Sequence, residues 1–326
     1  MDKTIFEYLL EKNYLMSESY GKVHNSQNLY HYTSPEGFLG IVRNDKIKLW
    51  FTRYDGLNDT TERKNIISSL DNYCDKQVQN NIFTTEFSEL VKSVQLQDKT
   101  VLTYPTDEML EVDNGEGIQP VTESKSIACD TYLCCFSEES DMLPMWNYYS
   151  KSQHYEGYSL GFLNYGLAQE NCFKKGYRFD LKRVIYADKE KHETFDKIIL
   201  PLYEIYCDGN NQIKNEVKKI LNMRINDLQF IFKNNCFEHE KEIRAILKIP
   251  KKPLDKAQQF TVKYRNSNGY IVPYIEYFID KRSLISVTTA PLINSDLAIK
   301  TIKDILKQYN YSDNVSIKPS QIPIRF

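Results

Sequence analysis

The chain has 326 residues, which is enough for one large domain or two ordinary ones with a full hydrophobic core. Charged residues make up 26% of the chain and nearly balance, with a formal net charge of -2, so no overall basic field favours a general nucleic-acid-binding protein. The seven cysteines contain no CxxC pair and the five histidines do not cluster, so we expect reduced thiols and no metal site. No apolar run is long enough to span a bilayer and the first residues are too charged for a signal peptide, which predicts a cytoplasmic protein without a membrane partner.

Hydrophobic periodicity divides the start of the chain into alternating helices and strands. In chain order, the pattern predicts a helix over 4–15, a strand over 29–33, a helix from 35 to the turn at 44–45, a strand over 47–52 and helical structure over 61–96. Ser34 is a favoured N-cap residue and Pro35 suits the first helical position, so the second helix has a defined start. Asp59 stands three residues before Glu62, as in a capping box, so both side chains are expected to cap a helix.

One later segment shows no hydrophobic periodicity. Residues 103–125 are acidic and rich in turn-forming residues, which is typical of a lid or a disordered insertion. Around it, the pattern predicts strand 131–137, a helical turn 144–149, strands 157–162 and 177–188, helices within 191–233, strand 236–250, a hairpin about 268–269, strand 284–289, a helix from a Ser295 cap to 309, and a last strand within 315–326. No repeat or linker divides the chain, so we expect one α+β domain with a helical insertion.

The segment 236–250, CFEHEKEIRAILKIP, combines strand-like alternation with an unusual set of charges. A half-buried strand here would carry Glu240, Glu242 and Arg244 on one face. One interpretation is a solvated face on which Arg244 balances Glu242, since surface charge pairs are common and weak. The other is a functional site, because two carboxylates about 6.6 Å apart repel by about 2–3 kcal/mol at an effective dielectric constant near 20. A strand that tolerates this repulsion either exposes the carboxylates to solvent or uses their negative potential in a functional site.

Two further motifs contain candidate functional residues. In LYHYTS, a strand ends at His31, Tyr32 and Thr33 and leads directly into the capped helix. A hydrogen-bonded histidine at a strand end is the structural interpretation of His31. In MWNYY, a turn carries Trp146, followed by Tyr148 and Tyr149. Packing in the core is the structural interpretation of these aromatic residues, and for Trp146 it is the favoured one.

These motifs, taken together, resemble a known family. A strand ending in His-x-Thr, followed by a helix, a turn and a strand, is similar to the start of the DNA ADP-ribosyltransferase toxins and of RNA phosphotransferase-like members of the ADP-ribosyltransferase superfamily. The whole order resembles a bacterial family known as domain of unknown function 2971, which is recognised by HYT, an NDPxE-like segment, MWxxY followed by Gxxlxf, and ExExR. The matching residues are His31-Tyr32-Thr33, Asn58-Asp59 with Glu62, Met145-Trp146 with Tyr149, Gly157 to Phe162, and Glu240, Glu242 and Arg244. Thr60 replaces the family's proline and fits the first helical turn equally well.

The resemblance spans most of the chain and implies an α+β fold with an ADP-ribosyltransferase-like split sheet, mixed or antiparallel, and helical insertions. Residues 1–28 would form a helical extension. Residues 29–326 would form a single domain with helical or loop insertions near 60–127 and 190–235.

The superfamily cleaves the nicotinamide–ribose bond of NAD and transfers ADP-ribose to an acceptor or to water. Its transition state resembles an oxocarbenium ion, which a carboxylate near the ribose stabilises. By resemblance, His31 would bind an NAD ribose, with Thr33 or nearby backbone assisting. Tyr148 or Tyr149 would stack on nicotinamide. Tyr32 and Trp146, from the same motifs, complete this part of the expected NAD site.

The resemblance also assigns roles to the charged residues. Glu242 would be the catalytic carboxylate and Glu240 would orient the acceptor, although the two could exchange roles. Arg244 on the same face would keep Glu242 ionised, since a nearby cation lowers the pKa of a carboxyl group. Arg53, which follows the second strand, is a candidate to meet the pyrophosphate.

The leading hypothesis is therefore an NAD-consuming ADP-ribosyltransferase or NAD glycohydrolase, acting as a toxin or antiphage-defence effector. Its partners would be NAD as substrate, a protein, DNA or RNA acceptor, and an antitoxin or another component of a defence system. One alternative is a non-catalytic module on the same fold that binds a nucleotide or a partner. Another is a metal-dependent nuclease that uses Asp55, Asp59, Glu240 and Glu242, but these residues lie on separate elements without metal-ligand spacing.

Overall fold

The computed structural model describes residues 5–11, 20–24, 27–57, 62–94, 96, 100–113, 118–149, 156–167, 176–251, 260–267, 269–291 and 294–323. The helices are α1 Ile5–Glu11, α2 Pro35–Val42, α3 Glu62–Gln79, α4 Thr85–Lys92, α5 Leu143–Tyr149, α6 Asp188–Asp208, α7 Asn211–Leu228 and α8 Ser295–Gln308. The strands are β1 Asn28–Thr33, β2 Ile47–Arg53, β3 Thr100–Asp113, β4 Ile118–Ser137, β5 Tyr158–Leu163, β6 Arg178–Arg183, β7 Glu242–Pro250, β8 Lys263–Ser267, β9 Tyr270–Ile279, β10 Leu284–Thr289 and β11 Ser316–Pro319. Across this described part of the chain, no helix combines the length and apolar character needed to cross a bilayer.

One mixed, mostly antiparallel sheet organises the fold. Its main path runs β11-β10-β5-β1-β4-β2-β9-β8, and among the described pairs of these strands β10 and β11 are the parallel one. β4 also pairs with β7 along its other edge, β7 pairs with β6, and β3 pairs with the first half of β4. The predicted α+β class is therefore confirmed in its coarse form.

The sheet divides at β4. β7 pairs with β4 continuously from Cys129 to Ser137, so β1 and β2 share the opposite edge. There β2 reaches β4 at Tyr132 and Leu133, whereas β1 reaches it only at Ser137. Between these contacts the edge of β4 faces an opening, not a neighbouring strand. The sheet is therefore split at residues 134–136.

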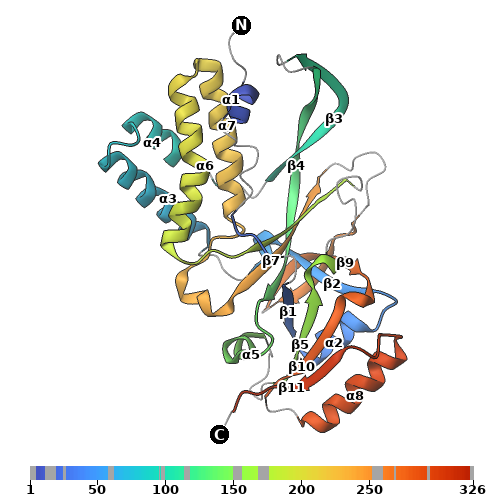
Figure 1. Cartoon of the computed structure of the whole chain (residues 1–326). Coiled ribbons are helices and arrows are strands. Elements are labelled where there is room, and N and C mark those ends of the chain that lie inside the picture. The colour runs from blue at the N-terminus through green and yellow to red at the C-terminus, as the bar shows by residue number, and fades with distance from the viewer. Residues whose placement is uncertain are drawn as a thin grey trace.

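Helices cover the two parts of the sheet in different ways. Figure 1 shows α3, α4, α6 and α7 gathered beside the upper half of the molecule, while α2 and α8 lie at the lower end. The first group encloses a core that includes Phe195 and Leu228 and reaches Leu133 and Ile246 of the sheet. A second core lies among the strands, α2 and α8. The two pairs α3–α4 and α6–α7, which belong to the two expected insertions, contact each other, for example through α3 and α6.

Most of the elements expected from periodicity are confirmed. The Ser34 side chain accepts a hydrogen bond from the backbone N–H of Gly37, and Pro35 occupies the first turn of α2. The last helix is capped one residue earlier than expected, because the side chain of Asn294, rather than that of Ser295, accepts from the N–H of Leu297. Asp59 and the turn residue Asn268 lie outside the described residues.

The prediction of a loop over 103–125 was wrong. Its described residues, 103–113 and 118–125, lie in the paired strands β3 and β4, which run from Thr100↔Cys129 to Asp113↔Ile118 with an irregularity between Pro105 and Met109. Figure 1 shows the hairpin rising away from the rest of the sheet. Backbone hydrogen bonds hold a hairpin without apolar alternation, and the second half of β4 anchors this one in the sheet. Periodicity therefore gave no sign of it.

The expected strand 236–250 also required correction. Residues Asn235–Glu240 form a 3-10 helix, η5, and Lys241 has a left-handed backbone with φ of 44°. β7 begins only at Glu242 and is buried on both faces, not half-buried. The cause is its position between β4 and β6, with one face toward the helices and the other toward the second core.

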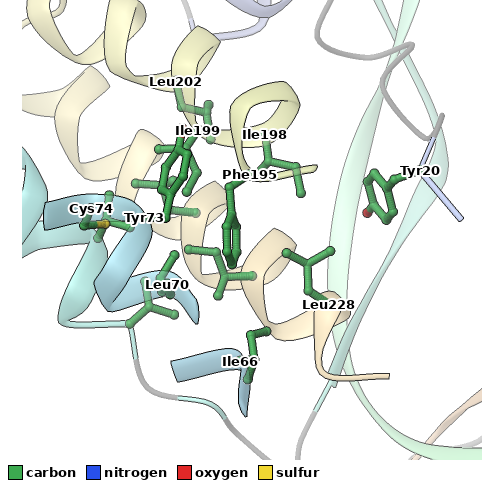
Figure 2. Close-up of a cluster of buried hydrophobic side chains, with 14 of the residues drawn as sticks. Tyr20, Ile66, Leu70, Tyr73, Cys74, Phe195, Ile198, Ile199, Leu202 and Leu228 are labelled. Carbon is green, nitrogen blue, oxygen red and sulfur yellow. The ribbon is translucent and has the colours of Figure 1, made fainter. Parts of the chain in front are cut away.

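Phe195 provides a test of the helical core. Figure 2 shows its ring among Tyr73, Leu70 and Leu228, and the ring is fully buried. We expect Phe195→Ala to lower the free energy of unfolding by about 3–5 kcal/mol, because it removes buried surface and leaves a cavity. Leu297→Ala, at an exposed position of α8, should change it by less than about 0.5 kcal/mol. Urea unfolding followed by circular dichroism measures both, and equal effects would contradict this description of the core.

Candidate functional site

A cavity of about 540 Å³ opens where the sheet splits. Its walls come from β1, β2, β4, β7, β8, α5 and η5, so it joins segments that are far apart in the sequence. Of the residues singled out from the sequence, the cavity is lined by His31, Tyr32, Tyr148, Tyr149, Glu240, Glu242 and Arg244. Thr33, Arg53 and Trp146 are not among the described residues that line it.

His31 bridges the gap between β1 and β4. Its Nδ1 lies 2.9 Å from the carbonyl oxygen of Cys135, at the open edge of β4. Since a carbonyl only accepts hydrogen bonds, Nδ1 carries the proton and Nε2 of the neutral ring is an acceptor. Burial lowers the pKa of His31, and the positive charge of Arg265 lowers it further, against the opposing effect of the Cys135 carbonyl. The ring is therefore neutral at pH 7. It provides a hydrogen-bond donor to the carbonyl of Cys135 on β4, and it also lines the cavity.

Glu242 and Arg244 form a buried ion pair on one face of β7. Arg244 Nε lies 2.9 Å from Glu242 Oε1 and Nη2 lies 3.2 Å from Oε2, a two-pronged geometry that is among the stronger pairings. The two residues are only 4% and 2% exposed. The interpretation of this face as solvated was therefore wrong, although its pairing of Arg244 with Glu242 is confirmed.

Lys233 balances the second carboxylate. Its Nζ donates to Glu240 Oε2 at 2.6 Å and to Glu242 Oε2 at 3.1 Å, in a buried position. Glu240 reaches this ammonium because η5 and the left-handed Lys241 turn the chain back before β7 begins. The repulsion expected between the two carboxylates is thus offset by two cations. We call Glu240, Glu242, Lys233 and Arg244 the charge network.

The two glutamates of the charge network differ in their protonation. Burial raises the pKa of Glu242, but Arg244 and Lys233 outweigh it and lower this pKa to about 2. For Glu240, burial is the larger effect and raises the pKa above its usual value despite Lys233. Glu242 is therefore a fixed anion, whereas Glu240 takes up a proton more readily.

α5 presents aromatic side chains to the cavity and is anchored by Trp146. Tyr148 and Tyr149 are 52% and 37% exposed and line the cavity, and Tyr148 Oη lies 3.2 Å from Nε2 of His239 on η5. Trp146 is buried, donates to Asp141 at 2.8 Å and meets the Tyr32 ring edge-on at 4.7 Å between centroids. The core-packing interpretation of Trp146 is therefore confirmed.

The hydroxyl of Tyr32 is fully engaged. It donates to the carbonyl of Glu139 at 2.8 Å and accepts from the N–H of Met142 at 3.1 Å. These bonds fix the chain segment that leads from β4 into α5. Tyr32 thus contributes part of the cavity wall and holds the segment that carries the two tyrosines.

Thr33 and Arg53 lie elsewhere. Thr33 pairs with Tyr158 at the end of β1, and its hydroxyl stands so close to Gly37 that a Cβ there would lie 1.9 Å away. Arg53 donates to both carboxylate oxygens of Asp55, at 2.7 and 2.8 Å. Asp55 is therefore paired with an arginine, and in the described residues no group of three His, Cys, Asp or Glu side chains is placed to hold a metal ion.

Sequence reasoning missed Lys233, Arg265, Trp50 and Thr52, all of which line the cavity. Lys233 stands at the end of the region that periodicity predicts as helical, and Arg265 lies on a hairpin strand among other polar residues. Neither position differs from an ordinary surface cation in the sequence. Only the tertiary packing turns them toward the cavity.

One family model matches part of the chain. The model described as Protein of unknown function (DUF2971) matches residues 145–245, from within α5 to within β7. This segment contains Trp146, Tyr149, Glu240, Glu242 and Arg244 and supports the resemblance to that family. No significant match was found among curated proteins or among solved structures.

The pKa of Glu242 predicts an acid dependence of stability. A carboxyl group with a lowered pKa in the folded state stabilises the fold above its unfolded pKa and loses this contribution as the pH falls. The difference between the ordinary pKa of 4.5 and a pKa of about 2 corresponds to about 3 kcal/mol. Between about pH 5 and pH 2, the free energy of unfolding should therefore fall by about 3 kcal/mol more in the wild type than in Glu242→Gln. Urea titrations across this range measure it, and parallel pH curves for the two proteins would refute it.

Proposed function

We propose that the protein binds NAD in this cavity and cleaves the bond between nicotinamide and ribose, as an ADP-ribosyltransferase or an NAD glycohydrolase. The supporting observation is that His31, Tyr149 and Glu242, from three distant parts of the sequence, line one cavity. Its volume of about 540 Å³ lies within the range typical of small-molecule sites.

The fixed negative charge of Glu242 suits the proposed reaction. When the C1′–N bond breaks, the electron pair goes to the ring nitrogen and nicotinamide leaves as a neutral molecule, so no general acid is needed. Positive charge develops on the ribose, and an ionised carboxylate placed there stabilises it. The low pKa of Glu242, to which Arg244 and Lys233 contribute, keeps this carboxylate charged at every physiological pH.

Glu240 suits the second half of the reaction. The acceptor, or water, forms a new bond to C1′ and must lose a proton. The raised pKa of Glu240 makes it the better proton acceptor of the two glutamates. The difference between the two pKa values thus supports Glu242 as the stabilising anion and Glu240 as the base.

His31 and the α5 tyrosines suit binding. Nε2 of the neutral imidazole is an acceptor for a ribose hydroxyl, because Nδ1–H is held by Cys135. Tyr148 and Tyr149 offer aromatic faces near an anion, and a cationic nicotinamide ring gains from both features.

The first test replaces Glu242. We expect Glu242→Gln to reduce nicotinamide release from NAD by about 100-fold or more, because the neutral amide no longer balances the developing charge. Chromatography of reaction mixtures containing protein, DNA and RNA acceptors measures the loss. Glu276→Gln, which changes an ion-paired glutamate on β9 outside the described lining of the cavity, should retain full activity. The proposal is refuted if the wild type leaves NAD intact when all three acceptors are present.

The second test concerns Tyr149. We expect Tyr149→Ala to raise the KM for NAD by about 3- to 30-fold, in line with a stacking and cation–π contribution of about 0.5–2 kcal/mol. Tyr149→Phe keeps the aromatic ring, so its KM for NAD should stay within about twofold of the wild-type KM. Steady-state kinetics with both variants separates the aromatic face from the hydroxyl, and equal losses in the two would contradict stacking.

A binding module without turnover is the second candidate. The observation that favours it is that cations already pair with both glutamates in a buried position. Calorimetric binding of NAD without release of nicotinamide would support this candidate.

For the catalytic candidate, an effector role as a toxin or in antiphage defence predicts growth arrest on expression of the wild type but not of Glu242→Gln.

A further inference from the structure

Arg265 lines the cavity, and no carboxylate among the described residues forms an ion pair with it. It lies on β8 and reaches across β9 to β2, where its Nη2 donates to the hydroxyl of Thr52 at 2.9 Å. Its guanidinium carbon stands 5.6 Å from the centroid of the Trp50 ring, a cation–π distance. Two neighbours on β2 therefore fix the direction of this side chain.

Among the described residues, the hydrogen bond to Thr52 is the one that Arg265 forms. Its Nε is buried and has no hydrogen-bond partner, and within the described part of the chain the residue forms no ion pair. Burial lowers the pKa of Arg265, while Tyr274 and Cys134 act in the other direction. A guanidinium stays protonated under such conditions, so Arg265 brings to the cavity wall a positive charge that no ion pair among the described residues balances.

The charges that line the cavity leave Arg265 in excess. Glu240 and Glu242 balance Lys233 and Arg244, and His31 is neutral. Among the described lining residues, Arg265 is therefore the cation without a matching anion.

We infer that Arg265, held by Trp50 and Thr52, binds the phosphate groups of a nucleotide ligand. A guanidinium is the side-chain cation best suited to phosphate oxygens, and burial strengthens the attraction. This inference rests on the proposed function only in taking the ligand to be a nucleotide that fills the same cavity.

The hydroxyl that holds Arg265 and the charge network belong to residues that pair with different positions along β4. Thr52 pairs with Leu133 of β4, and Glu242 pairs with Ser137 on the other edge of the same strand. Four residues along a strand span about 13 Å. A ligand with phosphates at one end and a cationic or electron-poor ring at the other would complement both Arg265 and the charge network. Arg265 thereby takes the place for which the sequence suggested Arg53, whose guanidinium is bound to Asp55.

Calorimetry with three probes tests the inference. ADP-ribose and inorganic pyrophosphate carry the phosphates, while adenosine carries none. We expect Arg265→Gln to weaken binding of ADP-ribose and of pyrophosphate by about 10-fold or more and to leave adenosine unchanged. Arg265→Lys keeps the charge but loses the two-pronged geometry, so its affinity for ADP-ribose and pyrophosphate should lie between those of the wild type and Arg265→Gln. Arg282→Gln, at an exposed arginine paired with Asp280, controls for the loss of one positive charge and should bind as the wild type does.

The outcomes separate this inference from the proposed reaction. The phosphate site is overturned if Arg265→Gln binds ADP-ribose and pyrophosphate with unchanged affinity. It is also overturned if the wild type binds neither probe. If NAD is cleaved and Arg265→Gln keeps the wild-type KM, the reaction stands and the phosphate site falls. If ADP-ribose binds through Arg265 but NAD is never cleaved, the phosphate site stands and the reaction falls.

Discussion

The charge network is the interaction on which the candidate site depends. Moving an ion into a protein interior costs several kcal/mol even after relaxation, so four buried charges persist only if their geometry satisfies all of them. Here Arg244 also donates to the carbonyl of Phe230 at 2.9 Å, which ties β7 to the chain segment after α7. The backbone N–H of Glu242 donates to the hydroxyl of Tyr186 at 3.0 Å. The network therefore fixes β7, η5 and the end of the helical layer against one another, and with them the floor of the cavity.

The split in the sheet provides the space above that floor. An antiparallel ladder normally satisfies every carbonyl along an inner strand edge, and a gap leaves some of them without a strand partner. The bond from His31 to the Cys135 carbonyl meets this requirement with a side chain. A single histidine thus allows the edge of β4 to remain open and fixes its own tautomer. The same contact explains why the structural and functional interpretations of His31 are compatible.

The sequence predicted the parts of this arrangement that depend on local pattern. The capped helix after β1, the short helix with Trp146 and the strand order along the chain follow from periodicity and from capping residues, which act over a few positions. The acidic segment was misread because η5 happens to alternate Glu238 and Glu240 with other side chains, as a strand would. The balancing role of Lys233 and the direction of Arg265 depend on contacts between segments that no local pattern encodes. The hairpin of β3 and β4 escaped prediction for a related reason, since cross-strand backbone bonds hold it.

The charge network also limits how Glu242 can act. Because Arg244 and Lys233 already bind its carboxylate, part of its field is neutralised before any ligand arrives. The gain is orientation: the carboxylate is held in one position and does not need to reorganise as positive charge develops nearby. Burial raises the pKa of Glu240, and its ion pair with Lys233 and the more distant charge of Arg244 do not offset this effect. Lys233 is common to both glutamates, so the pairing of Arg244 with Glu242 gives the two carboxylates different protonation behaviour in the same cavity.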